Sequence, residues 1–327
     1  MKSVFKKITT LLLSCALIVP VAHNVVSLKG AGKTKFTYLI AGLDDAASNT
    51  DVLMLISLDS ARGAASVIQI PRDTYADFGG KINKINHLYP TEILGESTPR
   101  AAMERTTDFV ADMLGVQIDG FLSVTTSAFR DFVDSIGGVL INMPDDLEFY
   151  EGGRKVSLKK GENLLDADTS LAFVRHRKSY PTGDLGRINA QKIFLDGVYY
   201  SITKRAGYDT LFTMISRLGD GVVTNVSILD VLIMVLKRSS KFKDIAVTYL
   251  TLPGEAVEKG GIWYYVPNRL ATLHALNSHM GYEVDFDREK RLVDLNDKAM
   301  SNVYYKNHFR YPEYIKNEVN YIVVQNS

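Results

Sequence analysis

Apolar residues recur along the chain with two periods, which predict where strands and helices lie. Short apolar runs bounded by turn residues predict strands at 36–41, 52–58, 65–70, 120–124, 139–143 and 245–252. Apolar positions three and four residues apart predict helices at 99–114, 127–136, 188–201, 211–218 and 229–237. Strands that alternate with helices indicate an α/β protein whose central sheet is covered by helices on both faces.

Local turn and cap residues sharpen several of these boundaries. Thr98 before Pro99 is the pattern of an N-cap followed by a first-turn proline, and Gly115 ends the same helix. Pro253 and Gly254 turn the strand at 245–252 back on itself, so we expect 263–266 to be its hairpin partner.

The N-terminal segment has the pattern of a membrane anchor. Lys2, Lys6 and Lys7 precede an apolar run at 8–22, which apolar residues up to position 28 extend towards spanning length. A cleaved signal sequence and a lipoprotein signal ending at Cys15 are alternatives. We favour the uncleaved anchor, which would be single-pass in the cell membrane with its N-terminus cytoplasmic and the rest of the chain extracytoplasmic.

These patterns divide the chain into four parts. Residues 1–29 form a basic tip and a transmembrane signal-anchor, 30–35 a linker, 36–280 an extracytoplasmic domain, and 281–327 a C-terminal extension without an assigned role. A hydrophobic content of 46% and a charged content of 23% are typical of a globular protein. The net charge of +1 argues against bulk binding of nucleic acid. The single cysteine excludes an intramolecular disulfide and a CxxC pair.

Arginines gather in the segment 173–177 and just after it. Read as a strand, this segment places Arg175 and Arg177 on one face, while Arg187 and Gln191 lie one turn apart on the following helix. Asp184 is the only acidic residue between Leu171 and Gln191, so nearby carboxylates are scarce. Clustered guanidinium groups match phosphate oxygens in bidentate geometry. The cluster therefore indicates a phosphate ligand, although a surface strand with dispersed salt bridges is the simpler alternative.

Two carboxylates and three further charged residues lie in or beside the loops between the predicted elements. Asp44 and Asp51 flank one short loop and suit a hard cation, Mg²⁺ or Mn²⁺, although a turn residue and a cap are an equally open interpretation. Arg72 and Asp73 follow Pro71, and Lys84 lies in a polar loop at 81–87. Phosphoryl transfer needs positioning and charge neutralisation, which these cations with a divalent ion would supply, while Asp73 would orient Arg72.

Other chemistries lack their motifs. The chain has no Gly-x-Ser-x-Gly elbow, no His-Glu-x-x-His pair and no dinucleotide-binding glycine fingerprint after its first strand. Serine hydrolases, zinc peptidases and Rossmann oxidoreductases are therefore excluded.

The order of these segments resembles that of the LytR-CpsA-Psr family of bacterial cell-wall phosphotransferases. The segments that carry the resemblance are Gly42-Leu43-Asp44, Thr50-Asp51, Ile70-Pro71-Arg72-Asp73, Lys84-Ile85-Asn86-His87, Phe173-Val174-Arg175-His176-Arg177, Gly183-Asp184 to Arg187, and Gln191. The similarity extends over about 35–280. The loop before Thr50 departs from the family, because Asn49 stands where serine or arginine is common.

This resemblance implies a three-layer α-β-α domain with a mixed central sheet and an apolar tunnel for a polyprenyl chain. It implies Mg²⁺-assisted transfer of a glycopolymer phosphate from a polyprenyl-diphosphate carrier to a peptidoglycan hydroxyl. The metal would be managed by Asp44 and Asp51. The diphosphate would be held by Arg72, Lys84, Arg175, Arg177, Arg187 and Gln191, with Arg72, Asp73, Arg175 and Arg177 as the catalytic set.

Two other functions stay open at this point. A pyrophosphatase would split the same polyprenyl-diphosphate glycan with water. A non-catalytic lipid-binding protein would match the family's older description as transcription attenuators. The predicted anchor and the absence of a helix-turn-helix count against DNA contact. The partners expected are therefore the lipid-linked glycan, peptidoglycan and the membrane, without nucleic acid.

Overall fold

The computed structural model describes residues 34–44, 49–59, 61–78, 81–95, 97–180, 184–202, 221–226, 246–282 and 322–323. The predicted anchor at 1–29, the helices predicted at 211–218 and 229–237, and most of the C-terminal extension lie outside these residues. No helix within the described ranges is long and apolar enough to cross a membrane.

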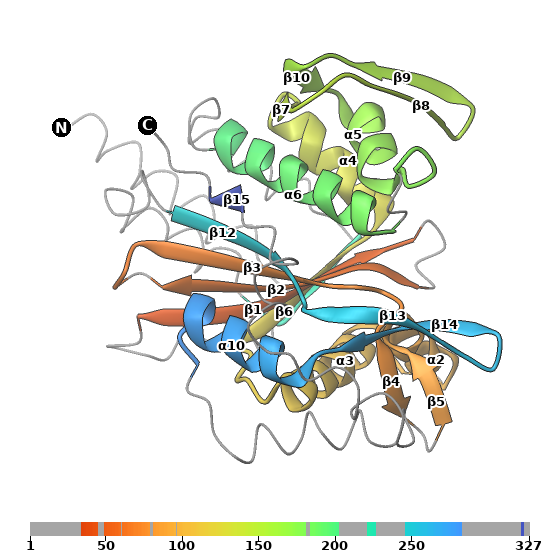
Figure 1. The fold of residues 1–327 in the computed structure, drawn as a ribbon, viewed down its shortest axis with the longest axis vertical. Coiled ribbons are helices and arrows are strands. Elements are labelled where there is room, and N and C mark those ends of the chain that lie inside the picture. Colours follow the sequence, from red (N-terminus) through yellow and green to blue (C-terminus); the bar gives the residue numbers. More distant parts are fainter. Residues whose placement is uncertain are drawn as a thin grey trace, which may run out of the picture.

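A mixed seven-stranded sheet forms the centre of the described fold (Figure 1). Its order is β11 (Val222–Thr224), β6 (Gly120–Val124), β1 (Lys35–Leu43), β2 (Thr50–Asp59), β3 (Ala64–Ile70), β12 (Ala246–Thr251) and β15 (Ile322–Val323). Strands β1, β2 and β3 pair antiparallel, whereas β6 runs parallel to β1 and β12 runs parallel to β3. The mixed central sheet that the resemblance implies is therefore confirmed.

Helices lie on both faces of this sheet (Figure 1). One face carries α4 (Thr126–Ser135), α5 (Ala167–Arg175) and α6 (Asp184–Tyr200). The other carries α2 (Leu88–Leu94), α3 (Pro99–Leu114) and α10 (Arg269–Met280). Alternation along β1 and β2 explains this arrangement, because Leu39 and Leu55 belong to the core that also contains Met103 of α3 and Leu276 of α10.

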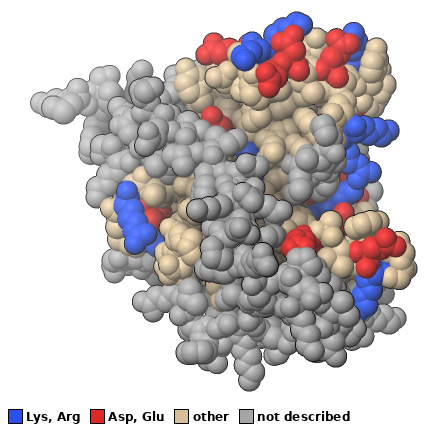
Figure 2. Space-filling view, in the orientation of Figure 1, with Lys and Arg blue, Asp and Glu red and all other residues tan. Residues whose placement is uncertain are grey.

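Smaller antiparallel pairs flank the central sheet. They are β4 (Tyr75–Phe78) with β5 (Lys81–Lys84), β7 (Val139–Met143) with β10 (Gly161–Leu165), β8 (Leu147–Glu151) with β9 (Arg154–Leu158), and β13 (Gly254–Lys259) with β14 (Ile262–Pro267). Acidic and basic side chains intermingle over the β8–β10 region at the top of Figure 2, where Lys155 pairs with Glu148 and Lys159 with Asp146. This region has no single-sign charge of the kind that binds nucleic acid.

Three local predictions were wrong. Phe173–Arg177 is not a strand, because α5 continues to Arg175 and only His176 turns to extended backbone. The strand β12 has no hairpin partner at 263–266, since it pairs with β3 while β14 pairs with β13. The predicted loop at 81–87 contains the strand β5 and a 3₁₀ turn, Ile85–His87.

Candidate active site

The predicted site residues of the first three strands meet at one edge of the central sheet. Leu43 at the end of β1 pairs with Thr50 at the start of β2, and Leu53 pairs with Ile70 at the end of β3. This register brings Asp44, Asp51 and Arg72 to the same edge. Strand β6 ends there too, because Val124 pairs with Gly42. An edge where several strands end is a common location for sites in α/β proteins.

Two ion pairs organise the charged residues that follow β3. The Arg72 Nη1 group donates a hydrogen bond to Oδ1 of Asp51 at 2.9 Å. The Lys84 ammonium donates to Oδ1 of Asp73, also at 2.9 Å. Asp73 was expected to orient Arg72, but the geometry gives that role to Asp51. All four side chains are partly exposed, so they remain accessible to a ligand.

Helices α5 and α6 bring two more arginines to this edge. Arg175 ends α5, where the last carbonyl groups favour a cation. Its Nη2 group donates to Oγ1 of Thr126 at 2.9 Å, at the beginning of α4. Arg187 is buried near the beginning of α6, and Gln191 follows one turn later. The Gln191 amide donates to the Val174 carbonyl at 3.0 Å, which ties α6 to α5.

The cluster is therefore assembled from residues far apart in the sequence. Arg175, Arg187, Gln191 and Asp51 line one cavity, while Arg72 reaches it through its ion pair with Asp51. The side chain of Arg177 is exposed and does not belong to the lining of this cavity. The structure thus separates two arginines that a strand would have placed side by side.

The carboxylate of Asp44 lies at the beginning of the loop that precedes Asp51. Its Oδ2 accepts a hydrogen bond from Nδ2 of Asn49 at 2.9 Å, and its N–H donates to the Asn49 carbonyl at 3.0 Å. No group of three or more acidic, histidine or cysteine side chains capable of holding a metal occurs in the described part of the chain. Two carboxylates at one edge still fit Mg²⁺, which takes one or two protein carboxylates and completes its shell with phosphate oxygens and water.

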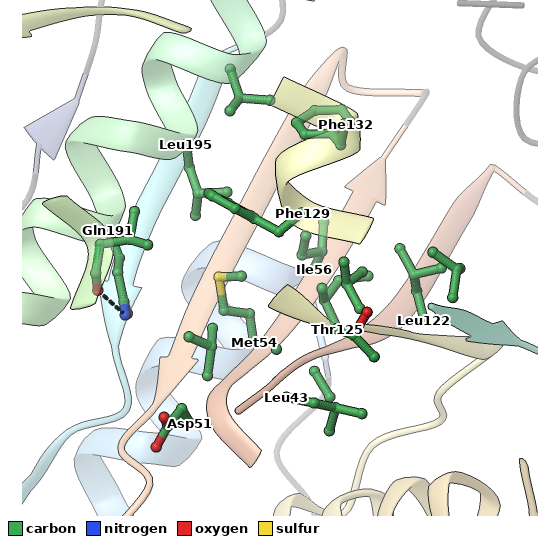
Figure 3. A pocket seen from close by; sticks show the side chains of 18 of the residues that line it. Leu43, Asp51, Met54, Ile56, Leu122, Thr125, Phe129, Phe132, Gln191 and Leu195 are labelled. Atoms are coloured by element: carbon green, nitrogen blue, oxygen red, sulfur yellow. Dashed lines mark hydrogen bonds between the residues drawn. The ribbon is translucent and has the colours of Figure 1, made fainter. Parts of the chain in front are cut away.

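An apolar cavity of about 510 Å³ begins at this charged edge. Its floor is the face of β1 and β2 that carries Ile40, Met54 and Ile56, and its walls come from α4, α5 and α6. Asp51 marks one end in Figure 3, and Phe129, Phe132 and Leu195 lie towards the other. Lining residues run from Asp51 to Leu58 along β2, a length of about 23 Å at 3.3 Å per residue. The cavity therefore suits a long apolar chain with an anionic head.

A buried histidine fixes the segment between Arg175 and Arg177. The ring of His176 is only 1% exposed and stacks on Phe149 of β8 at 4.0 Å between centroids. Its Nε2 accepts the Ser179 N–H at 3.0 Å, so its Nδ1 carries the proton that faces Oε2 of Glu151 at 3.2 Å. The arginine segment is thereby attached to the β8–β9 hairpin.

Sequence reasoning missed Thr126, the His176–Glu151 pair and the buried Lys192. Thr125 and Thr126 follow a predicted strand and precede a predicted helix, a signal that pointed to polar residues at the sheet edge. Lys192 follows Gln191 and is 5% exposed, and burial lowers the pKa of its ammonium to about 8. Nothing in the sequence distinguishes it from a surface lysine.

Comparison with known proteins identifies the fold. The LytR_cpsA_psr family model matches residues 19–279, which is most of the chain. This chain belongs to the LytR-CpsA-Psr family. All of the site residues described above fall within the matched LytR-CpsA-Psr region.

Individual relatives agree with this assignment. The chain is 31% identical over 238 residues to a Bacillus anthracis protein named polyisoprenyl-teichoic acid--peptidoglycan teichoic acid transferase TagU, covering 69% of this chain and 72% of the relative. The crystal structure of Bacillus subtilis TagV is 25% identical, with a TM-score of 0.63, covering 77% of this chain and 99% of that chain. The structure of TagT bound to LIIa-WTA, 24% identical, shares the LytR-CpsA-Psr fold with a TM-score of 0.61 over 79% of this chain and 95% of that chain.

Proposed function

We propose that this protein is a phosphotransferase that moves a glycopolymer phosphate from a polyprenyl-diphosphate carrier to a hydroxyl of peptidoglycan. The observation that carries the proposal is the apolar cavity that ends at Arg175, Arg187 and Gln191. A polyprenyl diphosphate has the same division into a long apolar chain and an anionic head. The names of the TagU relatives, which specify polyisoprenyl-teichoic acid and peptidoglycan, support this choice of donor and acceptor.

The reaction exchanges one phosphorus–oxygen bond for another. The acceptor hydroxyl oxygen attacks the phosphorus that carries the glycan, and the bond from this phosphorus to the bridging oxygen breaks. Polyprenyl monophosphate leaves, and the hydroxyl proton passes to a carboxylate of the site. Asp73 is the candidate for this proton, since it follows Arg72 after the end of β3 and its carboxylate, which accepts a hydrogen bond from Lys84 at 2.9 Å, is partly exposed.

The cations of the site neutralise the diphosphate as charge develops on the leaving oxygen. Arg175 and Arg187 contact the phosphates at the mouth of the cavity, and the Gln191 amide donates from the same wall. Arg72 and Lys84 approach from the sheet edge, and Arg177, whose side chain is exposed, follows Arg175 by two residues. Hydrogen bonds from these charged groups to phosphate oxygens are charge-assisted and therefore stronger than bonds between neutral groups.

Asp44 and Asp51 are the residues that would hold Mg²⁺ or Mn²⁺. When bound, such an ion would neutralise phosphate oxygens of the donor. Asp44→Ala should shift the Mg²⁺ titration of the transfer rate to higher concentration, whereas Asp112→Ala, an exposed carboxylate of α3, should not. An unchanged titration in Asp44→Ala would remove this residue from the metal site.

The location of the protein follows from the same proposal. Residues 1–29 would anchor the chain in the cell membrane with the N-terminus in the cytoplasm, and 36–280 would form the extracytoplasmic catalytic domain. Peptidoglycan and the glycan end of the lipid carrier both lie outside the membrane, where this arrangement places the charged edge of the sheet.

The proposal is tested by incubating the full chain with a polyprenyl-diphosphate-linked sugar, Mg²⁺ and peptidoglycan oligomers, and identifying the products by mass. We expect glycan phosphate joined to the oligomer and one polyprenyl phosphate released for each transfer. Free sugar phosphate in the presence of the acceptor would establish a pyrophosphatase instead. Unchanged lipid-linked sugar that remains bound to the protein would establish a binding role.

A further inference from the structure

The β13–β14 hairpin presents an unusual face next to the charged edge. Its tip is Gly260–Gly261, both with positive φ, which makes the turn tight. Val257, Tyr264 and Val266 face inwards and pack with Tyr75 of β4. The register pairs Ala256 with Tyr265 and Glu258 with Trp263, so these residues share the opposite side. We refer to Ala256, Glu258, Trp263 and Tyr265 as the outer face.

This hairpin is attached directly to the segment that carries Arg72 and Asp73. The Tyr265 N–H donates to the Asp73 carbonyl at 2.8 Å, and Thr74 forms a parallel bridge with Tyr265. The Tyr265 hydroxyl donates to the Leu252 carbonyl at 2.6 Å. On the inner side, the rings of Tyr264 and Tyr75 meet edge to face at 5.8 Å between centroids. The outer face therefore has a fixed position relative to Asp73.

Trp263 is the prominent group of the outer face. It lies two residues beyond Tyr265, about 6.6 Å along the strand, and its side chain is 57% exposed. The neighbouring Ile262 is 49% exposed on the inner side of the tip. Ile262 therefore does not extend the outer face. What distinguishes Trp263 is its large, mostly exposed indole, and tryptophan is enriched at binding surfaces because it combines an apolar ring with a polar N–H group.

The chemistry of the outer face matches a sugar ring. An indole presents a flat apolar surface to the C–H groups of a pyranose, and the Glu258 carboxylate directly opposite accepts hydrogen bonds from hydroxyl groups. The charged residues of the hairpin are Glu255, Glu258 and Lys259. Only Glu258 shares the outer face with Trp263, and an anionic lipid surface would repel it. The pattern therefore favours a glycan over a membrane.

The position of the hairpin distinguishes the acceptor glycan from the donor glycan. Attacking and leaving oxygens lie roughly in line across the transferred phosphorus. The leaving polyprenyl phosphate belongs to the cavity under α4, α5 and α6, so the acceptor approaches from the side away from it. The described hairpin residues do not belong to the cavity lining, and β13 and β14 extend beyond the sheet near β4 and β5 (Figure 1).

We propose that the outer face of the β13–β14 hairpin binds the glycan strand of the peptidoglycan acceptor, with a sugar ring stacked on Trp263. This inference rests on the proposed function, because it takes the acceptor from that reaction. The site determines how the acceptor hydroxyl is presented to the phosphorus, and it does not contribute to holding the lipid carrier.

The chain itself provides the probe for this site, because Trp263 is its only tryptophan. The intrinsic fluorescence of the full-length protein is recorded while peptidoglycan oligomers are added. We expect a saturable change in emission as a sugar covers the indole. The readout does not require turnover, so a protein that binds oligomers but transfers nothing would disprove the proposed function and leave this site intact.

Separate additions identify the source of any signal. A fluorescence change with the polyprenyl-diphosphate-linked sugar but none with oligomers would assign the face to the donor and overturn the proposal. A change only with phosphatidylglycerol vesicles would assign it to the membrane and also overturn it. Silence with all three probes would show that Trp263 binds no glycan.

Variants then connect the site to the reaction. Trp263→Ala should raise the KM for oligomers about tenfold and leave kcat and the KM for the lipid-linked donor unchanged. Trp263→Phe keeps an aromatic ring, so its KM for oligomers should rise less than that of Trp263→Ala. Tyr200→Ala removes an aromatic side chain that is 45% exposed at the far end of α6 and should change neither KM. An equal rise in the KM for oligomers in Tyr200→Ala, or an unchanged KM in Trp263→Ala, would contradict the proposal.

Discussion

The two arginines of the 173–177 segment have different environments, and their replacement should have different effects. Arg175→Ala removes a guanidinium group that lines the cavity and is positioned by Thr126. We expect kcat/KM for transfer to fall about 10- to 100-fold, the loss of one charged hydrogen-bond pair to phosphate. Arg177→Ala removes an exposed group and should reduce kcat/KM less than Arg175→Ala does. Unchanged melting temperatures would exclude misfolding, and equal losses in the two variants would contradict this assignment.

His176 positions the arginine segment without reaching the phosphates. His176→Phe keeps an aromatic ring on Phe149 but removes the hydrogen bonds to Glu151 and Ser179. We expect the free energy of unfolding in urea to fall by about 1–3 kcal/mol, the net value of two hydrogen bonds. The kcat should fall with it, because Arg175 loses its support. Glu151→Gln retains an acceptor for Nδ1, so its free energy of unfolding and its kcat should fall less than those of His176→Phe. A larger fall in Glu151→Gln would refute the proposed arrangement.

Because Lys192 is buried, the free energy of unfolding should change with pH in the alkaline range. Burial lowers its pKa from 10.5 to about 8. Between these values the unfolded chain binds more protons than the folded chain, so the free energy of unfolding rises with pH, while below pH 8 the full cost of the buried charge remains. Lys192→Met should therefore be more stable at pH 7 by up to about 3 kcal/mol.

Comparing the two proteins cancels the titration of tyrosines that both contain. The stability difference, measured by urea denaturation from pH 7 to 10.5, should shrink towards the alkaline end. A difference that stays constant over this range would show that Lys192 is not desolvated in the folded chain.

At the level of elements, α6 depends on a glycine that brings it close to β7. A Cβ at Gly197 would lie 2.6 Å from the Leu140 carbonyl oxygen and 2.8 Å from a methyl group of Ile141. Glycine to alanine in a helix ordinarily stabilises by about 1 kcal/mol. Here the clash with backbone outweighs that gain, so Gly197→Ala should lower the melting temperature and displace Arg187 and Gln191, raising the KM for the donor.

An exposed position of the same helix provides the control. Asn189 is exposed, and alanine has a higher helix propensity than asparagine, so Asn189→Ala should raise the melting temperature slightly. If Gly197→Ala were as stable as Asn189→Ala, the close packing of α6 on β7 would not be important.

Elements with strong local signals were predicted from the sequence. Thr98 caps α3 by accepting the Ala101 N–H, and Gly115 ends it in the left-handed region, as their residue types indicated. The strand predicted at 173–177 failed because five residues are too few to separate a period of two from a helical period. The overlooked signal was Asp166, whose side chain caps α5 by accepting the Thr169 N–H at 2.7 Å.

Pairings between distant segments had no such signal. Strand β12 pairs with β3, which lies far upstream, so local turn residues pointed to the wrong partner. Asp44, Asp51 and Arg72 were proposed as site residues because they flank strand ends, but the ion pair of Arg72 was not predicted. Asp51 rather than Asp73 holds Arg72 since side-chain partners depend on the register of the sheet.

At the scale of the whole molecule, one face of β2 lines the cavity and the other packs in the core. Substitutions at two adjacent residues of β2 can therefore distinguish the two environments. Ile56 faces the cavity, whereas Leu55 faces the packed core beneath α3 and α10. Ile56→Phe adds volume where room exists, so its melting temperature should stay close to that of the unmodified protein. Leu55→Phe overfills a close-packed core and should lower the free energy of unfolding by about 1–3 kcal/mol.

Their effects on catalysis should be reversed. A larger side chain at Ile56 shortens the space for the lipid, so the KM should rise for donors with long polyprenyl chains and change little for donors with short ones. Leu55→Phe should leave this dependence on chain length as it is, because its side chain points away from the cavity. Transfer rates with donors of graded chain length measure the difference. If Ile56→Phe showed no preference for short chains, the cavity would not hold the lipid and the anionic head alone would account for donor binding.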